Sequence, residues 1–363
     1  MYRTFVPFLL LASPALADVP QVVTDIAPVH GLVSRVMDGV GEPTLLLPPG
    51  QSPHDYAMRP SDARKLQKAQ VVFWMGESLT PWLEKPLSTL GDGAAQVELL
   101  EIEGAPLLEY AEDHDDEHDE DGHEADHDDE KHADGHDGEK HSDGHDEDHH
   151  DEDHADTHDE DEHGHDDDHA ESHDEADHEE DHADAHGHHH HDGVDPHAWL
   201  DPEVARFWLP HIAQALADAD PENAARYQDN AAAADQELAA LTTEISSQLA
   251  PIAGVPFVAF HDAYAYLEHR FDLANVGTVA AGDASDPGAA HMVELRDKIA
   301  EKQVKCGFTE PQYDPILLKV AGENLGLRIA ELDPLGIQIE LGPDYYLALL
   351  RSLADALTGC LAE

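Results

Sequence analysis

Three histidines of this 363-residue chain stand at positions where metal ligands are often found. His54 comes after the apolar run 44–47, His261 directly follows the apolar run 257–260, and His197 lies in a turn flanked by prolines. In open parallel sheets, ligands collect outside the carboxyl ends of the strands, which is where His54 and His261 would lie. Neutral imidazole nitrogens suit Zn²⁺, which accepts three histidines and one oxygen in a tetrahedral shell.

The spacing of these histidines is by itself a weak signal, because it matches no short zinc motif such as HExxH or CxxC. Any one of them, taken alone, is better explained as a polar turn residue. Outside residues 112–192, four further histidines have plainer, structural interpretations at helix starts or within helices: His30, His211, His269 and His291. The hypothesis of a metal site therefore rests on the shared strand-edge position of the first three.

Charge is distributed very unevenly along the chain, whose formal net charge is -61. Residues 112–192 hold 40 of the 80 acidic side chains and 23 of the 30 histidines. With almost no large apolar residue, this segment is predicted to be a disordered loop. Its composition favours weak, multiple binding of divalent ions, and the alternative is a solvating spacer whose histidines have no role. So acidic a chain repels nucleic acid, which is excluded as a partner.

The remaining sequence alternates short apolar runs with amphipathic stretches, as βα units do. It predicts an α/β fold of two βα lobes, each a small, mostly parallel sheet flanked by helices, joined by one long rigid helix. The N-terminal lobe would span 18–220, the interlobe helix 221–250, and the C-terminal lobe 251–363. Predicted strands are 21–25, 44–47, 70–75, 96–100, 257–260, 273–279, 305–309 and 327–332. Predicted helices are 28–39, 60–68, 80–90, 201–219, 262–271, 289–303, 313–324 and 343–358.

The first seventeen residues are typical of a signal peptide, with Arg3, an apolar run and the small-residue pattern Ala15-Leu16-Ala17. We therefore expect cleavage before Asp18 and export of the chain. No later segment approaches the ~20 apolar residues of a membrane helix, so the exported protein is expected in the periplasm.

Two cysteines, Cys306 and Cys360, make up the whole cysteine content. In an oxidising compartment they favour one disulfide, and the alternative is two buried free thiols. Neither lies at the end of the signal segment, so a lipid anchor is not expected.

Five stretches carry a resemblance to a known family: SPHDYAMRPSD, DPHAWLDPE, VAFHDAYAYLEHRF, GFTEPQYDP and ELDPLG. In these five stretches the chain resembles the zinc-specific solute-binding proteins of ATP-binding-cassette (ABC) importers, the ZnuA type of cluster A-I (cluster 9). The resemblance implies that His54, His197 and His261 bind the metal, with Asp333 or a water as fourth ligand. Relatives that bind manganese or iron have a carboxylate in place of His261. Some zinc relatives have a glutamate where this chain has Pro53, so that ligand is absent.

We therefore predict a monomeric periplasmic protein that captures Zn²⁺ in the interlobe cleft and delivers it to an ABC permease in the inner membrane, without a catalytic step. A zinc buffer or metallochaperone acting mainly through the loop, and a manganese- or iron-binding relative, are the alternatives. A zinc hydrolase is a further one, because three histidines with an open fourth position also describe catalytic zinc sites.

Overall fold

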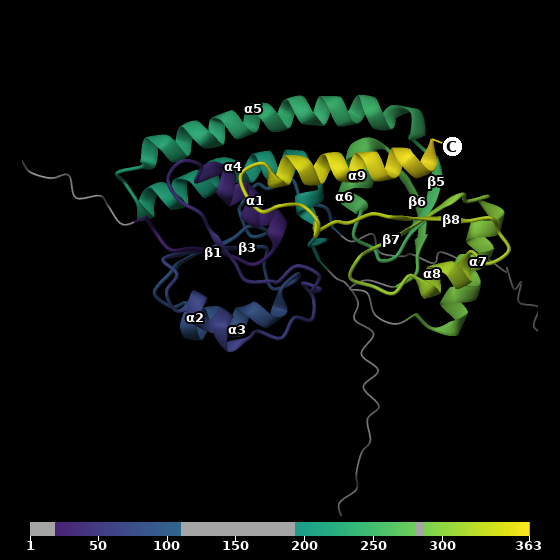
Figure 1. Ribbon diagram of the computed structural model, residues 1–363, viewed down its shortest axis with the longest axis horizontal. Coiled ribbons are helices and arrows are strands. Elements are labelled where there is room, and N and C mark those ends of the chain that lie inside the picture. Colours follow the sequence, from purple (N-terminus) through teal and green to yellow (C-terminus); the bar gives the residue numbers. More distant parts are fainter. Residues whose placement is uncertain (1–18, 110–192, 281–286, 363) are drawn as a thin grey trace, which may run out of the picture. The chain divides into compact units, whose positions relative to one another are not determined.

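Two four-stranded parallel sheets provide the framework of the computed structural model, which describes residues 19–109, 193–280 and 287–362 (Figure 1). The first sheet has the strand order β2-β1-β3-β4. Its strands are β1 (Val22–Thr24), β2 (Thr44–Leu45), β3 (Val71–Trp74) and β4 (Ala95–Glu98). The helices α1 (Ala27–Val36), α2 (Pro60–Leu66) and α3 (Pro81–Leu90) connect them. Helical connections of this kind allow neighbouring strands to run parallel.

The second sheet repeats this design with the order β6-β5-β7-β8. Its strands are β5 (Pro256–Ala259), β6 (Ala274–Thr278), β7 (Cys306–Thr309) and β8 (Arg328–Glu331). Its helices are α6 (Ala265–Phe271), α7 (Ala289–Glu301), α8 (Ile316–Ala321) and α9 (Tyr345–Leu361). In both sheets the first strand in sequence lies between the second and the third, so strands that are distant in sequence are neighbours. Because the strands are parallel, their carboxyl ends lie at the same edge of the sheet.

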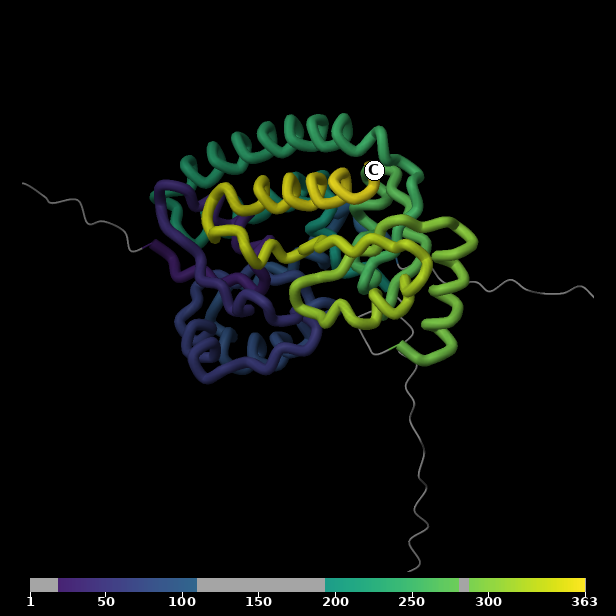
Figure 2. The backbone as a smooth tube through the Cα atoms, turned by 45° about the vertical axis from the view of Figure 1, so that its right-hand side comes forward, coloured from purple at the N-terminus to yellow at the C-terminus, as the bar shows by residue number. Residues whose placement is uncertain are grey.

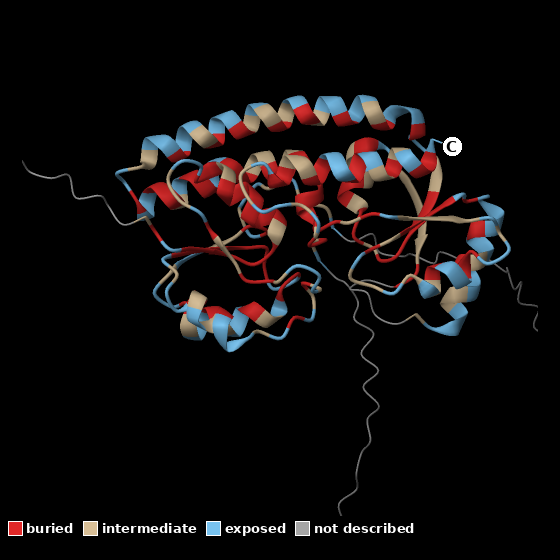
Figure 3. Cartoon of the chain, in the orientation of Figure 1, coloured by how far each residue is buried: buried red, intermediate tan, exposed pale blue. Residues whose placement is uncertain are grey.

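A 26-residue helix, α5 (Ala224–Leu249), leads from the first part of the chain into β5 through the 3₁₀ turn η2 (Ala250–Ile252). At 1.5 Å per residue it is about 39 Å long. Its buried residues recur every three or four positions: Tyr227, Ala231, Ala234, Leu238, Leu241, Ile245 and Leu249. That stripe packs on α4 (Pro202–Ala219), α1 and α9, and the opposite side is exposed (Figures 2 and 3). Burial along the full length explains why the helix is continuous.

Asp201 starts α4 and also ties it to α6. Its carboxylate accepts a hydrogen bond from the backbone N–H of Glu203, at 2.8 Å, as an N-cap does. Pro202 occupies the first helical turn, where a missing N–H is harmless. The guanidinium of Arg270 donates to both carboxylate oxygens, at 2.8 and 2.7 Å. One side chain thus fixes the start of α4 against the helix that follows His261.

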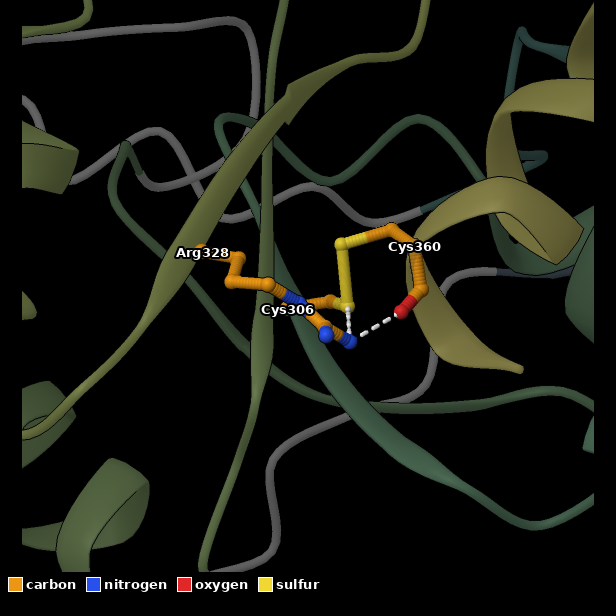
Figure 4. Close-up of a disulfide and its surroundings, with 3 residues drawn as sticks. All are labelled: Cys306, Arg328 and Cys360. Carbon is orange, nitrogen blue, oxygen red and sulfur yellow. Dashed lines mark hydrogen bonds between the residues drawn. A yellow bond between two sulfur atoms is a disulfide. The ribbon is translucent and has the colours of Figure 1, made fainter. Parts of the chain in front are cut away.

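A disulfide joins Cys306, the first residue of β7, to Cys360 near the end of α9 (Figure 4). Arg328, from the neighbouring strand β8, donates to the carbonyl oxygen of Cys360 and lies 3.6 Å from the sulfur of Cys306. The pairing expected from two lone cysteines is therefore present. It ties the carboxyl end of α9 to the amino end of β7.

The predicted α/β class and both parallel sheets are confirmed, with helix and strand ends within a few residues of those expected. All of these elements belong to one compact unit. The lobe boundaries near 220 and 250 stay a prediction. The predicted signal peptide 1–17 and the acidic segment 112–192 lie outside the described residues. In the part of the chain that the structure describes, no helix is long and apolar enough to cross a membrane.

Candidate metal centre

The three strand-edge histidines converge on one point. Nitrogen atoms of His54, His197 and His261 all lie within 4.8 Å of one another, and the ring centroids are 5.3 to 6.0 Å apart. The Nε2 atoms of His197 and His261 are 3.4 Å apart. Two nitrogens bound to one tetrahedral Zn²⁺ at ~2.0–2.1 Å would be about 3.3 Å apart. The geometry therefore suits a small divalent ion held by imidazoles.

His261 is oriented by Glu310, a residue that sequence analysis did not single out. Strands β5 and β7 are parallel neighbours, so their carboxyl ends lie side by side. His261 comes two residues after β5 and Glu310 directly after β7. The Nδ1 atom of His261 lies 2.6 Å from a Glu310 oxygen. A carboxylate only accepts, so Nδ1 carries the proton and Nε2 is left with its lone pair toward the site.

The surroundings of His261 affect its proton affinity in two opposing ways. Burial lowers the pKa of the ring, but the carboxylates of Glu310, Asp262 and Asp195 together raise it, so the net pKa lies above the ordinary value. A ring with a raised pKa holds its proton to higher pH, and protons compete with a metal for the same nitrogen.

Asp195 orients His197 in the same way, and it too was missed from the sequence. One oxygen of Asp195 accepts from the backbone N–H of His197 at 2.9 Å and lies 2.8 Å from its Nδ1. Both side chains are buried. The signal that could have revealed this residue is the Asp-Pro-His spacing, since a carboxylate two residues before a turn histidine can reach its ring.

His54 lies in the loop after β2, and a side chain of α3 holds that loop. The indole N–H of Trp82 donates to the carbonyl oxygen of Pro53, at 2.7 Å. The Trp82 ring also packs edge-on against Tyr56, whose hydroxyl donates to Asp62 at the start of α2. The backbone on both sides of His54 is thus anchored to the first sheet's helices.

Asp333 does not join the three histidines. Its carboxylate accepts three backbone hydrogen bonds, from Leu335 at 3.0 Å, Gly336 at 2.9 Å and Ile337 at 2.6 Å. Burial raises its pKa, these bonds lower it, and the net pKa lies above the usual range. Its neighbour Pro334 lines the histidine pocket, the pocket that His54, His197 and His261 also line. The carbonyl oxygen of Pro334 accepts a hydrogen bond from the indole N–H of Trp199. The oxygens of Asp333 are therefore used to build the turn beside the pocket.

The remaining described histidines are consistent with their structural interpretations. The ring of His30 is buried, with Nδ1 3.2 Å from the Ser34 hydroxyl and Nε2 3.1 Å from the Pro43 carbonyl oxygen. His291 lies 2.8 Å from the carbonyl oxygen of Thr278. His211 and His269 are exposed on helices. Within the described ranges, no other group of three histidine, cysteine or carboxylate side chains has the spacing of a metal site.

Comparison with known families decides the identity. A family model described as "Zinc-uptake complex component A periplasmic" matches residues 22–360, nearly the whole chain. The chain belongs to the ZnuA family. One relative, "High-affinity zinc uptake system protein ZnuA" of Brucella suis biovar 1, is 40% identical over 94% of this chain and 92% of its own length. The protein of the same name from Paracoccus denitrificans is 43% identical over 96% of this chain and 94% of its own.

Solved structures agree with this ZnuA fold but do not distinguish the metal. A chain titled "Crystal structure of ZnuA" superimposes with a TM-score of 0.66 at 18% identity, covering 95% of this chain and all of the other. The solute-binding protein FpvC of Pseudomonas aeruginosa, solved with Mn²⁺, gives the same TM-score and identity, with 95% and 99% coverage. Because fold alone is shared by both, the donor set must decide which ion this ZnuA-family chain prefers.

Proposed function

We propose that this chain captures Zn²⁺ through His54, His197 and His261 and delivers it to an ABC permease. The observation that carries the proposal is the convergence of three imidazoles, two of them oriented by buried carboxylates. Three neutral nitrogen donors suit zinc, whereas manganese prefers carboxylate and carbonyl oxygens. Asp195 and Glu310 add two carboxylates around the site, which balance the charge of a divalent ion. The zinc-uptake names of the relatives support the same ion.

The chain acts as a monomeric carrier in the periplasm, released from its signal peptide, and performs no reaction. A hydrolase would need a carboxylate free to take a proton from zinc-bound water. The Glu310 carboxylate lines the pocket and is held at His261 through Oε1, while its Oε2 is buried without a partner among the described residues, and Asp195 is bonded to His197. Both carboxylates thus support ligands, and the site binds and releases its ion.

Removing residues 112–192 tests whether the tight site lies in this centre or in the acidic segment. The flanking backbone is already joined, since Glu109 and Val194 form an antiparallel bridge and the N–H of Asp195 donates to the Leu108 carbonyl oxygen at 2.9 Å. A short Gly-Ser linker should therefore leave the centre intact. We expect calorimetric titration to retain one tight zinc site per chain and to lose weaker ones. If all tight binding disappears with the segment, the buffer or metallochaperone alternative is correct instead.

Glu310→Gln should separate the charge of this residue from its hydrogen bond. The amide oxygen can still accept from Nδ1 of His261, but the carboxylate that raises the pKa of His261 is gone. Loss of a carboxylate behind a metal-bound histidine typically costs 10–100-fold in metal affinity, so we expect about that loss at pH 8. The pKa of His261 should fall, so the loss of zinc affinity on acidification should begin at lower pH than in the wild type.

Competition titrations with a zinc chelator from pH 8 to 5 measure both effects. The matched control is Glu331→Gln, because Glu331 is the exposed last residue of the adjacent strand β8. That variant should keep the wild-type affinity at every pH. Equal pH profiles for the wild type and Glu310→Gln would contradict the role given to Glu310.

A further inference from the structure

A buried amide oxygen in the histidine pocket has no hydrogen-bond partner among the residues that the structure describes. Gln312 follows β7 by three residues and lines the pocket together with His54, His197 and His261. Its Oε1 atom is fully buried and accepts no hydrogen bond from any described residue. Leaving a buried polar atom unpaired is costly, and such atoms usually mark the place of a water or an ion. Gln312, within the GFTEPQYDP stretch, therefore offers the pocket a hydrogen-bond acceptor in addition to the three histidines.

Zinc held by three histidines has one coordination position left. Asp333 is poorly placed to fill it, because both of its oxygens accept backbone hydrogen bonds within their own turn. A water at this position is polarised by the ion and becomes a strong hydrogen-bond donor. The pocket must then supply an acceptor for it, and two buried oxygens of its lining, Oε1 of Gln312 and Oε2 of Glu310, have no partner among the described residues. The Glu310 carboxylate already supports His261 through its other oxygen, whereas the Gln312 oxygen has no such role.

We propose that Oε1 of Gln312 accepts a hydrogen bond from the water that completes the zinc shell. The inference rests on the proposed function, since it needs zinc at the three histidines. The choice of side chain has a chemical consequence. A neutral amide accepts the hydrogen bond without taking the proton, so the water stays neutral and the pocket gains no further negative charge. Gln312 is thus a positioning residue for the fourth ligand, complementing Glu310 and Asp195 behind the histidines.

Gln312→Met in the full-length protein is the sharpest test, because methionine has nearly the same length and no strong acceptor. Without metal, the variant should be at least as stable as the wild type in thermal unfolding, since an unpaired buried oxygen has been removed. With zinc, its affinity should be about 3–10-fold weaker, which corresponds to one lost hydrogen bond. Chelator competition at one zinc per chain measures the dominant site.

Gln312→Glu should restore zinc affinity to at least the wild-type level, because the carboxylate keeps the accepting oxygen. Spectra of the Co²⁺-loaded proteins at one equivalent provide a second measurement. Gln312→Met should shift the visible bands relative to the wild type. Gln248→Met should not, because Gln248 is an α5 residue outside the pocket that is bonded to Asp355. The proposal is overturned if Gln312→Met binds zinc like the wild type, or if the Met and Glu variants are weakened equally.

His261→Ala, titrated in parallel, keeps the two levels of inference apart. If the wild type shows no tight zinc site that depends on His261, the proposed function itself fails. If His261→Ala abolishes that site while Gln312→Met leaves affinity and cobalt spectrum unchanged, only the role of Gln312 fails.

Discussion

Replacing His261 with alanine is expected to weaken zinc binding by more than about 100-fold. Altering a group behind a metal ligand already costs 10–100-fold, so removing the ligand itself should cost more. His261 is buried, and its Nε2 faces that of His197 at 3.4 Å. Without the third imidazole, two nitrogen donors and water remain. Chelator competition at pH 8 measures the effect, and circular dichroism verifies that the variant is folded.

His269→Ala is the matched control for this variant. His269 lies on α6, the helix that follows His261, but its side chain is exposed and outside the pocket. Its zinc affinity should be that of the wild type. A similar loss in both variants would mean that the change acts through α6 rather than through the metal shell.

The choice of metal can be tested at the same position with His261→Glu, which replaces a nitrogen donor by a harder oxygen. Such a site should lose zinc affinity and become more permissive to Mn²⁺. In the metal-free protein, the new carboxylate would lie beside Glu310, and two carboxylates so close tend to share one proton. Combining His261→Glu with Glu310→Gln removes this repulsion, so the double variant should gain more Mn²⁺ affinity than His261→Glu alone.

Removing the disulfide, by replacing both Cys306 and Cys360 with alanine, should lower the free energy of unfolding by about 4 kcal/mol. The bond closes a loop between residues 54 apart in sequence. Such cross-links stabilise by restricting the unfolded chain, with ~3 kcal/mol for a 15-residue loop and ~4.7 kcal/mol for a 100-residue loop. Urea unfolding of the metal-free proteins measures the difference, and wild-type protein in excess reductant should behave like the double variant.

Zinc affinity should change little in the same double variant. The disulfide lies at the amino end of β7, whereas Glu310 follows the carboxyl end of that strand. The sheet pairing of β7 with β5 and β8 should hold the strand in place without the bond. A large loss of zinc affinity, with an unfolding energy near that of the wild type, would contradict this division between stability and binding.

The sequence alone determined the local elements and the candidate ligands. Apolar runs such as 257–260 predict strands, and the Ala- and Leu-rich stretch after Pro221 predicts the long helix, because both patterns depend only on nearby residues. The motifs around His54, His197 and His261 indicate a metal site through residue type and position at the strand edges.

Only the tertiary structure decided what surrounds these histidines. Glu310 reaches His261 because β5 and β7 are neighbours, although the two residues are 49 positions apart. Strand order is set by packing, which no local pattern encodes. The resemblance implies Asp333 or a water as the fourth ligand, and in the folded chain three backbone N–H groups after Asp333 donate to its oxygens. Only the folded chain shows which side-chain oxygens accept backbone hydrogen bonds and which side-chain atoms remain for a metal.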